Sequence, residues 1–148
     1  MIARRKFFSL AIGLGVLPVA WGYPNLADAD DDRLRMRDLY EKDGSFTRLA
    51  RRREATQVAV TGYMAPPLKA NTNFFVLTKR PMAVCPFCET EAEWPDDILA
   101  VYTRRIYDPV PFNREIVTKG ELDLGTETDD ETGFVSRVRI VNARFEYT

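Results

Sequence analysis

From Gln57 to the C-terminus, apolar and polar residues alternate in short runs, and no other feature of the chain constrains the fold as strongly. A period of two places every second side chain on one face of a β-strand. Prolines, glycines and polar turns separate the runs without the long helical patterns of βαβ units. The expected strands cover residues 57–65, 73–80, 97–106, 114–125 and 134–147. The pattern predicts a mainly β fold, a small OB-like five-stranded barrel or curled sheet preceded by a short helical segment.

The last two expected strands carry signs of local distortion. Gly120 is expected at a bulge or bend, because a glycine within a strand often marks one, and Gly125 is expected to close its strand. The fifth strand departs from a strict period of two. Its imperfectly alternating apolar positions are Val135, Val138, Ile140 and Ala143.

Residues 30–56 predict a helical lead-in of two short segments. Acidic residues crowd the start of segment 30–44, where the helix dipole favours negative charge, and Gly44 ends it. Ser45 is the candidate cap of the second segment. The apolar residues on one face of that segment are Phe46, Leu49 and Ala50. The basic run at 51–53 could bind phosphate or an acidic partner, but a solvated helix end is the favoured interpretation.

Residues 1–29 have the form of an export signal. Arg4, Arg5 and Lys6 precede an apolar stretch of about 15 residues, shorter than the roughly 20 that a membrane-spanning helix needs. "RRKFF" is similar to a twin-arginine signal, with Ala3 where Ser or Thr is usual. Ordinary secretion and a retained anchor are the alternatives. We expect cleavage near Ala29, a periplasmic protein, and contact with the membrane only through the uncleaved signal.

Charge and composition exclude some classes of function. The chain has 148 residues, enough for one domain after the signal, which we place at 57–148 as an OB-like β domain. Its formal net charge of −1 argues against binding nucleic acid through a strong overall field. The chain has no histidine, so the commonest general base and metal ligand is missing. A binding or accessory module is therefore expected rather than an enzyme.

The two cysteines of the chain form a Cys85-Pro86-Phe87-Cys88 sequence, for which three interpretations stay open. Two thiolates with the Met82 thioether, and Met64 assisting, would suit Cu(I), whereas Zn(II) would need further ligands such as nearby glutamates. In thiol–disulfide exchange, Cys85 would be the attacking thiolate and Cys88 the resolving thiol. The third interpretation is a structural disulfide in an oxidising compartment.

Four sequence motifs resemble those of a set of exported bacterial proteins of unknown function. The motifs are "VAVTGYMAPPL", "FFVLTKRPMAVCPFC", "WPDDILAVY" and "VTKGELDLGTETDDETGFVSRVRI". The resemblance extends over residues 48–145 and implies an OB-like fold, a cysteine-bearing Pro-rich loop and genes often located beside those of transport components. It thereby implies an accessory role in envelope transport or metal handling, with an envelope transporter or another periplasmic protein as partner. This chain differs in having two cysteines, with Pro86 between them and Pro95 after them.

Overall fold

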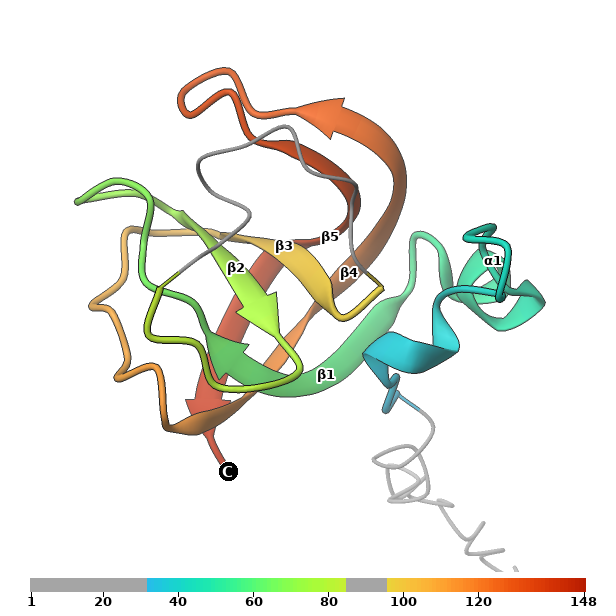
Figure 1. Ribbon diagram of the computed structural model, residues 1–148, viewed down its shortest axis with the longest axis horizontal. Coiled ribbons are helices and arrows are strands. Elements are labelled where there is room, and N and C mark those ends of the chain that lie inside the picture. Colours follow the sequence, from blue (N-terminus) through green and yellow to red (C-terminus); the bar gives the residue numbers. More distant parts are fainter. Residues whose placement is uncertain (1–31, 85–95) are drawn as a thin grey trace, which may run out of the picture.

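The computed structural model describes residues 32–84 and 96–148 as a mainly β domain with very little helix (Figure 1). Within these residues all five expected strands are present, so the prediction of a mainly β fold is confirmed. The strands are β1 (Gln57–Met64), β2 (Phe74–Thr78), β3 (Ile98–Thr103), β4 (Glu115–Thr128) and β5 (Val135–Tyr147). Before β1 lie the 3-10 helix η2 (Met36–Asp38) and the helix α1 (Arg48–Arg53). Neither of these described helices has the length and apolar character needed to cross a membrane.

The strands form one mixed sheet that curls back on itself. Its order is β1-β2-β3-β5-β4, and β4 returns to pair with β1. Neighbouring strands are antiparallel except β3 and β5, which run parallel. The β1–β4 pairing extends from Gln57 to Tyr63, whereas β1 pairs with β2 only through Tyr63 and Met64. Closure of the sheet therefore depends on a short contact between β1 and β2.

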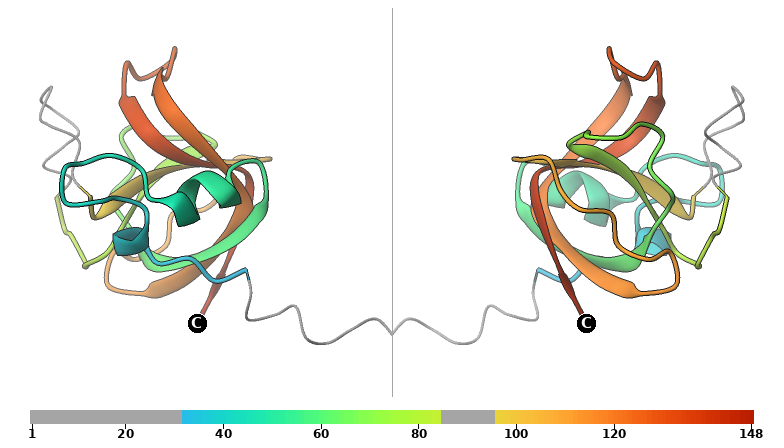
Figure 2. Two further views of the ribbon diagram at one scale, coloured as in Figure 1. Left: turned by 90° about the vertical axis from the view of Figure 1, so that its right-hand side faces the viewer. Right: turned by 90° about the vertical axis from the view of Figure 1, so that its left-hand side faces the viewer.

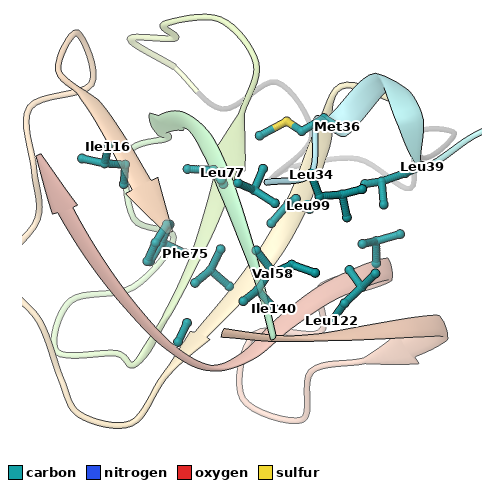
Figure 3. Packing of buried hydrophobic residues seen from close by; sticks show 14 of the residues in the cluster. Leu34, Met36, Leu39, Val58, Phe75, Leu77, Leu99, Ile116, Leu122 and Ile140 are labelled. Carbon is teal, nitrogen blue, oxygen red and sulfur yellow. The ribbon is translucent and has the colours of Figure 1, made fainter. Parts of the chain in front are cut away.

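The segment before η2 pairs with the part of β1 that β2 does not reach, and it thereby extends the closure of the sheet. The Leu34 N–H donates to the Ala59 carbonyl at 3.0 Å, and the Ala59 N–H donates to the Asp32 carbonyl at 2.7 Å. Leu34, Met36 and Leu39 then enter the core beside β2 and β3 (Figure 3). The predicted helix over residues 30–44 is thus reduced, in its described part, to η2. Burial of residues 34 and 36 requires an extended chain, in which side chains two apart share a face.

Helix α1 is capped by Thr47 rather than by the expected Ser45. The Thr47 hydroxyl accepts a hydrogen bond from the Ala50 N–H at 3.0 Å and donates to the Asp38 carbonyl at 2.7 Å. The Ser45 side chain instead donates to the Asp43 carboxylate. On the expected apolar face of α1, Ala50 is buried, whereas Leu49 is 36% exposed. The cap therefore ties this short helix to Asp38, the last residue of η2.

A Thr47→Ala variant is expected to lose about 1 kcal/mol of the free energy of unfolding, the usual cost of a lost helix cap. Urea unfolding followed by circular dichroism measures this loss. Ser45→Ala is the matched control, and it should change stability by less than about 0.5 kcal/mol because the Ser45 side chain caps no helix. Equal losses in the two variants would contradict the assignment of the cap.

Strands β2 and β3 are buried on both faces, which makes their hairpin the most enclosed part of the domain. Phe75, Leu77 and Leu99 face the main core inside the curled sheet. On the opposite face, Phe74 packs against Tyr102 and against Phe134 from the β4–β5 turn, with ring centroids 5.1 and 5.3 Å apart. The C-terminal end of β4 and the N-terminal end of β5 extend together beyond the other strands to this turn (Figure 2). The two clusters hold the β2–β3 hairpin from both sides.

Candidate functional site

The predicted thiol site belongs to the connection between β2 and β3. Cys85 and Cys88 lie in residues 85–95, outside the residues that the structure describes. Met82 lies just before this segment and is half-buried. The ends of the connection are close together, because the Lys79 N–H donates to the Asp97 carbonyl at 2.9 Å. The connection that carries both cysteines therefore begins and ends on the hairpin that is buried on both faces.

Further contacts fix the first residues of this connection. The Thr78 hydroxyl donates to the Arg80 carbonyl at 2.7 Å, and the Arg80 guanidinium lies 3.7 Å from the Asp97 carboxylate. Two residues after Met82, Val84 is 75% exposed. The chain thus turns from a buried strand to the surface within a few residues, and the segment with the two cysteines follows directly.

Met64, the other sulfur considered as a metal ligand, lies in the core. It is 1% exposed, and its thioether sulfur accepts a hydrogen bond from the Val110 N–H at 3.4 Å. This environment gives no support to the expectation that Met64 assists a metal ion held at the cysteines, which lie outside the described residues. Strand alternation points Met64 inward with Val58 and Val60. The inward position of Met64 could therefore have been predicted from the sequence pattern.

The basic run at 51–53 forms the end of α1. Arg51 donates to the Phe46 carbonyl at 3.4 Å, and the Arg53 guanidinium lies 3.9 Å from the Asp32 carboxylate. Arg51 and Arg52 are exposed. These contacts agree with the favoured interpretation of a solvated helix end that carries its own local partners.

The acidic sequence 126–133 forms the end of β4 and most of the turn that leads to β5. The Asp129 carboxylate accepts hydrogen bonds from the Thr132 N–H at 2.8 Å and from the Tyr102 hydroxyl at 3.1 Å. Burial, and then the Asp129 charge, raise the pKa of Tyr102 above its usual value. Burial by itself would raise the pKa of Asp129, but the hydrogen bonds from Thr132 and Tyr102 hold it below its usual value. No group of three or more Asp, Glu, Cys or His residues in segments 32–84 and 96–148 is placed to hold a metal ion.

One charged residue that the sequence analysis did not single out is buried. The Arg139 side chain is 4% exposed, and its guanidinium lies 2.7 Å from the Asp123 carboxylate and 3.3 Å from that of Glu127. It also donates to the Gly125 carbonyl at 2.8 Å and to the Ser136 hydroxyl at 3.1 Å. Its donors are thus committed to the β4–β5 hairpin, which indicates a structural role.

Comparison with known proteins yields a structural likeness but no match in sequence. No known family model and no curated protein sequence matches the chain. The fold is similar to that of a solved DUF3299 family protein from Pseudomonas aeruginosa PAO1, with a TM-score of 0.55 and 8% sequence identity. The match covers 78% of this chain and 95% of that chain. At this identity the likeness extends to the fold alone.

Proposed function

We propose that the chain is an exported binding module with an OB-like fold, whose β2–β3 connection takes up a soft metal ion through Cys85, Cys88 and Met82. The observation that carries the proposal is the anchoring of this connection. Both of its ends lie on one hairpin buried on both faces, and hairpin loops are ordinarily only about 2–5 residues long. Long loops held by a rigid scaffold are where binding residues concentrate.

The strand order supports the OB-like part of the proposal. An OB-fold is a five-stranded, partly open Greek-key barrel that binds ligands across strands 2 and 3 and the adjoining loops. Here the corresponding face contains Tyr102, Glu127 near the end of β4, and the β4–β5 turn with Asp129, Asp130 and Glu131. Clustered carboxylates repel the phosphates of nucleic acids. This surface therefore favours a partner other than nucleic acid, such as an envelope transporter or another periplasmic protein.

The ligand chemistry follows from the residues of the connection. Thiolate and thioether sulfur are soft ligands that suit Cu(I), and two thiolates also suit Zn(II) when oxygen or nitrogen ligands complete four positions. Because Met64 is held in the core, Met82 is the thioether that we assign to the site. A second copy of the chain, or carboxylates of the same connection, would supply the remaining ligands of zinc.

Protein recovered from the periplasm without chelators is expected to contain about one Cu(I) or Zn(II) per chain or per dimer, together with free thiols. Metal analysis and a thiol count measure this content. Cys88→Ser and Cys85→Ser should each abolish the bound metal, and Met82→Leu should weaken it. Met64→Leu is the matched control and should leave the metal content unchanged. The intact mass of the same sample tests cleavage near Ala29.

Protein with neither metal nor free thiols would contradict the metal assignment. The reduction potential would then separate the alternatives, because structural disulfides usually have potentials below about −300 mV and exchange proteins have more oxidising ones. A strongly reducing value with a lower melting temperature after reduction would indicate a structural disulfide. A more oxidising value with a low pKa at Cys85 would indicate thiol–disulfide exchange.

A further inference from the structure

Three basic residues on or directly after different strands meet on the outer face of the sheet. Lys119 of β4 and Arg144 of β5 are direct register partners. Arg104 follows the last residue of β3, Thr103, whose register partner is Ala143. Like charges that face each other across two strands destabilise a sheet. The arrangement therefore carries a cost that a bound anion would offset.

A β-bulge puts Arg144 on this face. The register passes from Lys119↔Arg144 to Glu121↔Val141, so that Asn142 and Ala143 together oppose Gly120. Asn142 has a φ of 53°, a left-handed conformation that is uncommon outside glycine. The extra residue shifts the alternation of β5 by one position, and without it Arg144 would point into the core.

The basic residues border a hollow whose size and chemistry suit a small anion. A cavity of about 80 Å³ is lined by Gln57, Arg104, Lys119, Asn142, Ala143 and Arg144. It adjoins a wider depression of about 320 Å³ that shares Gln57, Lys119 and Arg144 and has Ala59 among its lining residues. Small alanines leave room between the cations, and the two side-chain amides add hydrogen-bond donors.

The charges around the hollow leave two guanidinium groups available. Lys119 forms an ion pair with Glu146, and Asp32, which borders the wider depression, lies 3.9 Å from Arg53. In segments 32–84 and 96–148, the guanidinium groups of Arg104 and Arg144 form no hydrogen bond or ion pair. The hydrogen bond and charge of Lys119, and then the charge of Arg144, hold the pKa of Glu146 below its usual value. The planar donor fork of arginine matches the oxygens of a phosphate group.

We propose that this hollow is a binding site for a phosphate group, held by Arg104, Arg144 and Lys119 with help from the amides of Gln57 and Asn142. The phosphate is either free in solution or part of an anionic lipid headgroup. The site consists only of residues of β1, β4, β5 and the end of β3. It is independent of the thiol site, so the two proposals stand or fall separately.

Calorimetric titration with inorganic phosphate tests the site, with ionic strength kept constant by sodium chloride so that general screening is not mistaken for binding. Arg144→Gln and Arg104→Gln should each weaken phosphate binding about tenfold, since each removes a charge-assisted hydrogen bond. Glu146→Gln should strengthen binding about threefold by freeing the Lys119 ammonium. The melting temperature of Arg144→Gln should not fall, because the variant removes a like-charge pair.

Arg52→Gln is the matched control, because Arg52 is an exposed arginine on α1 and the charge change is the same. It should leave phosphate affinity unchanged. Sedimentation with phosphatidylglycerol vesicles separates the two sources of phosphate. Binding to vesicles that depends on Arg144 and exceeds that of inorganic phosphate indicates a lipid headgroup, and the reverse indicates free phosphate. Equal effects of Arg52→Gln and Arg144→Gln, or no binding of either probe, would overturn the proposal.

Discussion

A Gly120→Ala variant is expected to lose about 3 kcal/mol of the free energy of unfolding, at the upper end of the usual cost of overpacking. A methyl group at this position would lie 2.5 Å from Ile140 Cγ2 and 2.7 Å from the Val141 carbonyl oxygen. The Ala143 Cα would be 3.1 Å away. Two of these three atoms belong to the backbone of the bulge, so rotation of a side chain cannot relieve the overlap. Urea unfolding measures the loss.

Gly133→Ala is the matched control for this variant. No atom lies within 4 Å of the added methyl group, and the strain comes only from a φ of 71°. Both variants reduce the freedom of the unfolded chain equally, so their difference isolates the overlap at the bulge. We expect Gly133→Ala to lose about 1 kcal/mol of the free energy of unfolding. A loss at Gly120 no larger than this would show that the bulge adapts to a side chain.

The distortions of the last two strands were predicted from the sequence only in part. Gly120 was predicted at a bulge or bend, and the register shift between Lys119 and Glu121 lies at that position. The irregular step from Ile140 to Ala143 has the same cause, since the bulge adds one residue between them. Val135 does not follow the pattern, because it is 49% exposed and its neighbour Ser136 is buried instead.

Other features depend on contacts that a periodic pattern does not contain. The acidic start of segment 30–44 and Gly44 at its end suggested a helix, but the apolar residues of the segment pack against strands far along the chain. The pairing of Lys119 with Arg144, and the proximity of Arg104, require the register of three strands. A shift of one residue in the register of β5 would move Arg144 to the other face of the sheet. The local sequence pattern therefore could not predict that these three cations lie close together.

The sequence pattern gave no sign of Arg139 either, because an arginine between Val138 and Ile140 occupies an outward position of β5. Its burial arises from the far part of β4, where the register shifts between Leu124 and Glu127 and the chain folds over the guanidinium. Burial of a charge is costly unless it is paired and hydrogen-bonded. The energetic role of the Asp123 partner is therefore open to a direct test.

An Asp123→Ala variant is expected to lose about 2 kcal/mol of the free energy of unfolding. Removing one partner of a fully buried pair costs about 3–5 kcal/mol, but Asp123 is 38% exposed and Glu127 remains 3.3 Å from the guanidinium. Glu127→Ala is the matched control and should cost about 0.5 kcal/mol, as expected of an exposed pair. Urea unfolding of both variants gives the comparison.

The same Asp123→Ala change should cost less than about 0.5 kcal/mol when Arg139 is already methionine, because the carboxylate then has no buried charge to neutralise. An equal cost in the two backgrounds would mean that Asp123 stabilises the hairpin through contacts other than the ion pair. Salt gives an independent check. Since the Arg139 side chain is 4% exposed, ions in solution should screen the pair only weakly, and the cost should persist at high salt. A cost that disappears in salt would instead identify the pair as a surface interaction and Arg139 as a residue buried for its packing.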